Sequence, residues 1–187
     1  MVARPNQKPD PARPRHALAV ASFMLLAVWQ IYPTLSDFAH TALGHENNDV
    51  WNHIWGFAYV ASRLAEGQLP THTDLLFWPE GGSLWFIDTF GALLTLPVQW
   101  VAGPVAAMNT ACWFNFTLAG AATYALAWRV TETQPGAWLA GIAFQVTPHL
   151  MGQTYNGITE SLAVGWLPLA LLAIREAFHS PSRSRCL

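Results

Sequence analysis

Charged residues are scarce in this sequence and are missing from long stretches of it. Asp, Glu, Lys and Arg together make up 11% of the 187 residues, whereas soluble domains carry roughly 25%. None of them occurs from Thr89 to Trp128, a run of 40 positions, or from Ala17 to Ser36, a run of 20. Since about 20 apolar residues in a helix cross the hydrocarbon of a bilayer, these runs exclude an ordinary soluble globule and predict an integral membrane protein.

Cysteine and clustered basic residues are also lacking. Two cysteines, Cys112 and Cys186, exclude a disulfide framework and a cysteine-based zinc signature. The nine Lys and Arg residues are split among short segments, so no folded basic patch is expected and nucleic acid is excluded as a partner. The first apolar run is longer than the core of a signal peptide and predicts a membrane anchor.

The apolar runs predict an all-α fold, a polytopic transmembrane helix bundle with four spans. Gly103-Pro104 divides the longest run. If residues 86–102 lie flat on the outer surface, eight of the nine basic residues fall on the cytoplasmic side, as the positive-inside rule requires. If residues 86–102 cross as a fifth span, the rule is violated. The expected spans are about 17–36, 104–128, 136–148 and 161–174.

Four spans place both termini in the cytoplasm and the protein in a bacterial inner membrane. The expected parts are a disordered tail at 1–16, a transmembrane segment at 17–178 and a short cytoplasmic tail at 179–187. The transmembrane segment contains a first outer loop at about 37–103. A second outer loop is expected at 152–160, where the chain is polar and follows Pro148.

The first outer loop carries the densest polar motif of the chain, G-H-E-N-N-D-V-W-N-H from Gly44 to His53. A helix beginning near Asn48 places Asp49 and His53 four positions apart on one face, with Asn52 beside them. Apolar residues continue at helical spacing to Leu64, which predicts a helix lying on the membrane surface.

Three interpretations of this motif stay open. Glu46 and Asp49 could act on a lipid-linked substrate, one as a general base and both as ligands of a divalent cation such as Mg or Mn. They could instead be solvated acids that cap the helix. A zinc site could form from His45, Glu46, Asp49 and His53, although oxygen ligands suit a harder ion better.

Two further places carry candidate binding residues. Trp78 and Glu80, with Trp85 nearby, could clamp a glycan or a lipid headgroup, or the aromatics could simply anchor the loop at the membrane surface. Glu160 opens an apolar run, where a carboxylate suggests function because of its desolvation cost. A glutamate in the first turn also complements the helix dipole.

These motifs resemble the N-terminal part of the GT-C superfamily of polytopic membrane glycosyltransferases. The resemblance extends over about residues 17–178 and is carried by residues 44–55, 73–81, 96–109 and 125–131. It implies sugar transfer from a polyprenyl-phosphate donor to an extracytoplasmic acceptor in the cell envelope. It further implies a site built on Asp49 and Glu46, with His53 and Glu160 as secondary residues.

The chain departs from this family in one motif and in length. His45 follows Gly44 where the family often has an acid, and four spans are fewer than the eight or more that such enzymes have. We therefore expect a truncated relative. The alternative is a non-catalytic membrane protein, such as a pseudoenzyme or an envelope-assembly partner. A transporter ranks third, because no charged residue lies in the middle of a predicted span.

Overall fold

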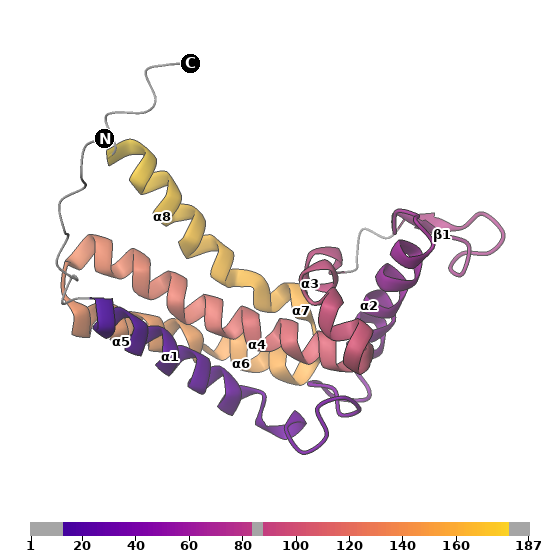
Figure 1. The fold of residues 1–187 in the computed structure, drawn as a ribbon, viewed down its shortest axis with the longest axis horizontal. Helices are drawn as coiled ribbons and strands as arrows, with labels where there is room; N and C mark the ends of the chain where they lie inside the picture. The colour runs from indigo at the N-terminus through magenta and orange to yellow at the C-terminus, as the bar shows by residue number, and fades with distance from the viewer. Residues whose placement is uncertain (1–12, 84–87, 180–187) are drawn as a thin grey trace, which may run out of the picture.

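The computed structural model describes residues 13–83 and 88–179, and within them the fold is all-α apart from one small hairpin (Figure 1). The predicted fold class is confirmed at this level. Strands β1 (His72–Thr73) and β2 (Gly82–Ser83) pair antiparallel, with His72 opposite Ser83. The helices are α1 (Arg13–Gln30), η1 (Tyr32–Thr34), α2 (Val50–Ala65), α3 (Thr89–Leu94), α4 (Leu96–Thr131), α5 (Gln134–Gln145), α6 (Pro148–Asn156), α7 (Thr159–Leu162), η2 (Ala163–Gly165) and α8 (Trp166–His179).

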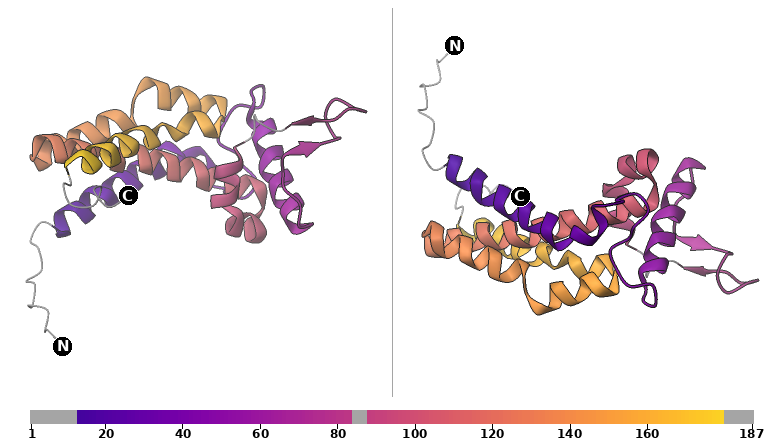
Figure 2. Two further views of the ribbon diagram at one scale, coloured as in Figure 1. Left: turned by 90° about the horizontal axis from the view of Figure 1, so that it is seen from above. Right: turned by 90° about the horizontal axis from the view of Figure 1, so that it is seen from below.

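Helix α4 is the axis of the molecule, and the other helices pack around it (Figures 1 and 2). Helix α1 runs antiparallel to α4, since His16 contacts Tyr124 while Ala27 packs with Phe116. Helix α8 diverges from α4 toward its own C-terminus (Figure 1). Helix α2 and the hairpin lie together at the far end of the bundle (Figure 2).

Small residues permit the closest helix crossings. A β-carbon added to Gly120 of α4 would lie 2.7 Å from the Phe23 ring of α1, and one added to Gly141 of α5 would lie 2.7 Å from the Gly120 carbonyl oxygen. One added to Gly165 would lie 2.6 Å from the backbone nitrogen of Ala119. Small residues at these three positions therefore allow close helix contact.

Buried amide side chains hold the helices together. Gln145 donates to the Phe23 carbonyl oxygen at 3.0 Å and to Oε1 of Gln30 at 2.9 Å, and Gln30 donates back to the Gln145 carbonyl oxygen at 2.9 Å. Asn115 donates to the Thr159 carbonyl oxygen at 3.3 Å. These polar residues therefore serve helix packing, as expected of polar groups inside apolar bundles.

The predicted division at Gly103-Pro104 is confirmed as a break within α4. Gly103 has φ 86° and ψ 174°, a backbone conformation that is not helical, and no β-carbon strains it there. Whether residues 86–102 lie flat on the membrane surface stays a prediction, and most of the described residues among them belong to two helices. Asp88 caps the short helix α3, and a second helix begins at Leu96. Residues 86 and 87 lie outside the described ranges.

The structure corrects the predicted number of spans. Within the described ranges, one helical stretch, Thr159–His179, is long and apolar enough to cross a membrane, with 21 residues and a mean hydropathy of 1.4. Helix α5 has 12 residues and extends about 18 Å, short of the roughly 30 Å of hydrocarbon. It ends at Gln145 because Thr147 takes an extended conformation before Pro148 opens α6.

Two other boundaries also differ from the expected ones. Helix α1 begins at Arg13, so part of the expected disordered tail at 1–16 is helical; residues 1–12 lie outside the described ranges. The second outer loop, expected at 152–160, is largely helix α6 followed by a left-handed Gly157. The C-terminal tail beyond His179 also lies outside the described ranges.

Candidate functional site

The two predicted outer loops meet at one end of the bundle, through His53 of α2 and Glu160 of α7. Nδ1 of His53 lies 3.1 Å from Oε2 of Glu160. The His53 side chain is 4% exposed and the Glu160 side chain is 45% exposed. This Nδ1 has no aligned hydrogen bond, so the contact is a close approach of the two side chains. The contact brings together two candidate residues that are far apart in the sequence.

Four further contacts support the same junction. Nδ2 of Asn48 donates to the Tyr155 carbonyl oxygen at 3.2 Å and to Oδ1 of Asn156 at 3.4 Å. The His45 ring stacks on Tyr155 with centroids 4.8 Å apart. Gly157 has φ 71°, and a β-carbon there would lie 2.9 Å from the Leu43 carbonyl oxygen. The polar motif of the first loop therefore rests directly on the α6–α7 turn.

Asp49 occupies the N-cap position of α2, as the capping interpretation expected, but its side chain makes no capping hydrogen bond. Its backbone oxygen accepts from the Asn52 and His53 amides at 2.9 and 3.2 Å. Because residues one turn apart share a helix face, Asp49 lies beside His53 with an exposed carboxylate. Asn52 is exposed on the same turn.

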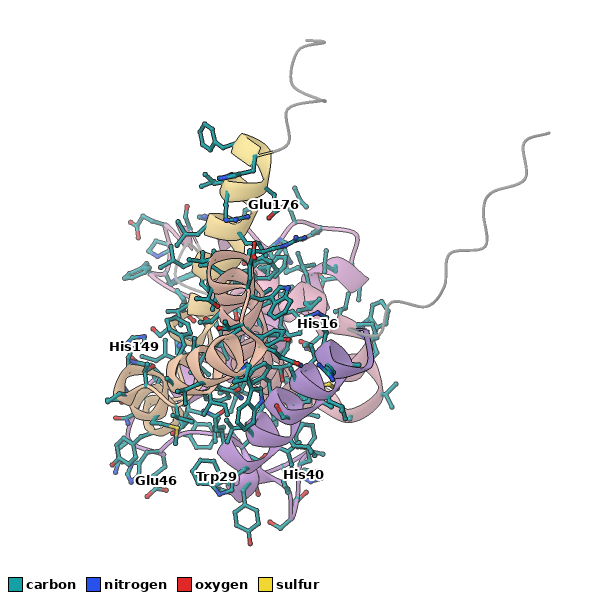
Figure 3. The ribbon with its side chains drawn as sticks, turned by 90° about the vertical axis from the view of Figure 1, so that its left-hand side faces the viewer. His16, Trp29, His40, Glu46, His149 and Glu176 are labelled. Atoms are coloured by element: carbon teal, nitrogen blue, oxygen red, sulfur yellow. The ribbon has the colours of Figure 1, made fainter. Side chains whose placement is uncertain are left out.

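Glu46 is exposed and precedes α2. Its backbone oxygen accepts a hydrogen bond from Nε1 of Trp51 at 2.8 Å. Figure 3 looks along the bundle and shows Glu46 and His149 on one side of the molecule, with His40 on the other. The carboxylate of Glu46 is thus available from solvent near the junction.

The segment that leads into this motif is fixed by Asn109, a fully buried side chain of α4. Oδ1 of Asn109 accepts from the Leu43 amide at 2.9 Å, and its Nδ2 donates to the carbonyl oxygens of Phe38 and Thr41 at 3.0 and 2.8 Å. The segment 38–43 therefore has a fixed path although it lacks regular structure. Gly44, which opens the motif, follows directly.

Trp78 and Glu80 lie elsewhere, on the loop that joins β1 to β2. Both are exposed, and the Trp78 side chain is 79% exposed. The hairpin packs beside the C-terminal half of α2, where Tyr59 donates to the His72 carbonyl oxygen at 2.7 Å. These two candidates are therefore on a different part of α2 from His53. Trp85 lies outside the described ranges.

The residues predicted to hold a divalent cation or zinc all lie in the first-loop motif at this junction. Over residues 13–83 and 88–179, no three His, Cys, Asp or Glu side chains are grouped closely enough to hold a metal ion. The cation on Asp49 and Glu46 stays a prediction.

Sequence reasoning missed the contacts that join the loops. Tyr155 carries no charge, and the pairing of Asn48 with Asn156 has no local signal. The sequence did indicate that the two loops lie on the same side of the membrane, because each follows an apolar run predicted to end there. Arg63, the one base of the first loop, was also passed over.

Over the described residues, fold and site together define a helical bundle with one small hairpin, in which two acid-bearing segments meet at one end. Comparison with known protein families, with curated proteins and with solved structures found no match for this chain.

Proposed function

We propose that this protein is a membrane-embedded, glycosyltransferase-like protein that transfers a sugar from a polyprenyl-phosphate donor to an acceptor on the outer face of a bacterial inner membrane. The observation that carries the proposal is the contact between His53 and Glu160. It unites the two segments that the sequence assigns to the same side of the membrane, and it places an exposed Asp49 one helical turn away.

The apolar outer surface supports embedding in a membrane. Leu18, Leu25 and Trp29 of α1 are 71%, 70% and 61% exposed, and Phe178 of α8 is 84% exposed. Side chains of this kind on an outer helix face are solvated by lipid and poorly solvated by water. The Thr159–His179 stretch, with only 17% of its most apolar window buried, adds the same signal.

The charge distribution supports one orientation. Arg129 of α4 and Arg175 of α8 both contact Glu176, at 3.5 and 3.0 Å. Arg15 of α1 lines the same hollow as Gln134 of α5, at the same end of the bundle. The acids Glu46, Asp49 and Glu160 are at the opposite end. The positive-inside rule then directs the basic end to the cytoplasm and the acidic end outward.

The proposed reaction uses Asp49 as the general base. Its carboxylate takes the proton of the acceptor hydroxyl while that oxygen forms a bond to the anomeric carbon of the sugar. The bond from this carbon to the phosphate oxygen breaks, and polyprenyl phosphate leaves with the electron pair. His53 and Glu160, with Asn52 beside them, orient the substrates, and Glu46 is the second carboxylate at the site. No step is routed through a metal ion.

Activity tests this proposal. The protein in membrane vesicles is incubated with a panel of polyprenyl-phosphate sugars, and release of polyprenyl phosphate is measured. Asp49→Asn should lower the rate at least 100-fold, the lower range for loss of a general base. The matched control is Asp37→Asn, an exposed acid of the same loop that pairs with His40, and its rate should equal that of the wild type.

Equal rates for the two variants would remove Asp49 from the chemistry. Absence of release with every donor would favour the non-catalytic alternative, a structural partner in envelope assembly.

Labelling tests the orientation: an impermeant maleimide should reach cysteine in Asn47→Cys from outside intact cells and should not reach cysteine in Thr133→Cys.

A further inference from the structure

A cavity lies away from the His53–Glu160 junction, between the C-terminal half of α2 and the chain leading into β1. It has a volume of about 680 Å³. Its first wall is Tyr59, Ser62, Arg63 and Glu66, which recur at i, i+3, i+4 and i+7 on one face of α2. Its second wall is the segment from Gln68 to Leu75.

Helix α2 therefore packs on the core with one face and lines the cavity with another. Phe57 and Val60 are buried against α4 in the core, while the Tyr59–Glu66 stripe faces the cavity. Along the helix axis, Arg63 lies ten residues beyond His53, about 15 Å away. A single extended ligand can therefore reach from the cavity toward the exposed Asp49.

The chemistry of the cavity wall is mixed and rich in planar polar groups. It offers the carboxylates of Glu66 and Asp74, the amide of Gln68, the imidazole of His72 and the guanidinium of Arg63. Nη1 of Arg63 is paired with Glu66 at 2.9 Å, but its Nε is buried and has no hydrogen-bond partner in the described part of the chain. A buried donor without a partner costs free energy unless a ligand atom accepts from it.

The net charge argues against an anionic ligand. Two carboxylates face one permanent cation in this cavity, so a phosphate or a uronic acid would meet net repulsion. Neutral hydroxyl groups, in contrast, can donate to the carboxylates and accept from Arg63 and Gln68. Leu69 and Leu75, 75% and 71% exposed, supply apolar surface for the C–H faces of a sugar ring.

We propose that this cavity binds a neutral saccharide chain, which is the acceptor of the sugar transfer. The assignment of the saccharide as acceptor rests on the proposed function, whereas saccharide binding in the cavity stands on the cavity itself. Two other hollows of about 430 and 440 Å³ flank α1, and they are lined mainly by apolar residues that suit lipid.

Direct binding tests the proposal without requiring transfer. The full chain in lipid nanodiscs is titrated with neutral cello-, manno- and chito-oligosaccharides, and binding is followed by saturation-transfer NMR. At least one series should bind. Asp74→Asn and Arg63→Gln should each weaken binding roughly tenfold or more, the loss expected for a hydrogen bond to a charged group.

Controls separate this binding from catalysis and from misfolding. Asp37→Asn, which changes an exposed acid outside the cavity, should bind saccharide as the wild type does. Arg63→Lys keeps the charge but lacks Nε as a planar donor, so it should bind as weakly as Arg63→Gln while keeping the wild-type thermal midpoint.

Three outcomes would overturn the proposal. They are no binding of any neutral series, binding that Asp74→Asn and Arg63→Gln leave unchanged, and binding restricted to oligogalacturonate or to an extended peptide. Loss of transfer in Asp49→Asn together with weakened saccharide binding in Asp74→Asn and Arg63→Gln would support both proposals. Saccharide binding with no transfer by the wild type would refute the proposed reaction alone.

Discussion

Replacing Asn109 with leucine should destabilise the protein and release the loop that carries the polar motif. Leucine has the same number and branching of side-chain heavy atoms as asparagine, so the change leaves no cavity and acts chiefly through hydrogen bonding; the extra bulk of its methyl groups is matched in the control below. The substitution removes three bonds, to the Leu43 amide and to the carbonyl oxygens of Phe38 and Thr41. The Leu43 amide is buried, because Leu43 is 4% exposed, and it cannot turn to water.

The magnitude follows from these three bonds. At roughly 0.5–1.5 kcal/mol net for each hydrogen bond, the loss is about 1.5–4.5 kcal/mol. At the roughly 0.6 kcal/mol average found for polar contacts between membrane helices, it is about 2 kcal/mol. We therefore expect Asn109→Leu to cost about 2–4 kcal/mol in the free energy of unfolding.

Asn115→Leu is the matched control, because Asn115 is equally central in α4 but makes one bond of 3.3 Å. It should cost about 1 kcal/mol. Unfolding is followed by tryptophan fluorescence during titration with a denaturing detergent, for which the ten tryptophans give a strong signal. In a Cys186→Ser background, cysteine in Asn47→Cys should react faster with maleimide when Asn109 is replaced. A cost no larger than that of Asn115→Leu, or an unchanged labelling rate, would refute the reasoning.

Three other experiments have defined outcomes. Gly120→Ala should lower the thermal midpoint by an overpacking cost of about 1–3 kcal/mol, because its β-carbon would meet Phe23, whereas Gly152→Ala, which has open space around it, should leave the midpoint unchanged. Phe23→Ala should cost about 3–5 kcal/mol in chemical denaturation, because this fully buried ring joins α1 to Tyr124 and Ala137; a loss below 1 kcal/mol would contradict this packing. In a double-mutant cycle, His53→Phe and Glu160→Gln should show a coupling energy of about 0.5–1 kcal/mol, as for a half-exposed ion pair, and strictly additive effects would show that the contact contributes nothing.

Local sequence signals predicted local structure well. The apolar spacing after Asn48 predicted α2, which begins at Val50 with Asp49 at its N-cap. Gly103-Pro104 predicted a break, because proline removes a backbone donor and glycine tolerates a positive φ. Both patterns depend on interactions among residues a few positions apart, so packing against distant parts of the chain does not change the structure that they predict.

Lengths and long-range contacts were harder to predict. The apolar run predicted a membrane span over residues 136–148. The helix ends earlier, because Thr147 is extended before Pro148, and α5 has 12 residues. The contact of His53 with Glu160 depends on how α2 and α7 each pack on α4, and no spacing rule encodes that geometry. The roles of Asp49 and Glu46 stay predictions.

The position of α4 in the chain has a consequence for the order of assembly. Asn109 bonds to residues 38–43, which have already been synthesised when α4 emerges from the ribosome. Asn115, two turns further along, needs Thr159, which is made later. Since chains fold from the N-terminus during synthesis, the first half of α4 can lock onto α1 and its loop at once. Its second half keeps an unsatisfied amide until α7 arrives, so the acid-bearing segments can meet only when the bundle is closed.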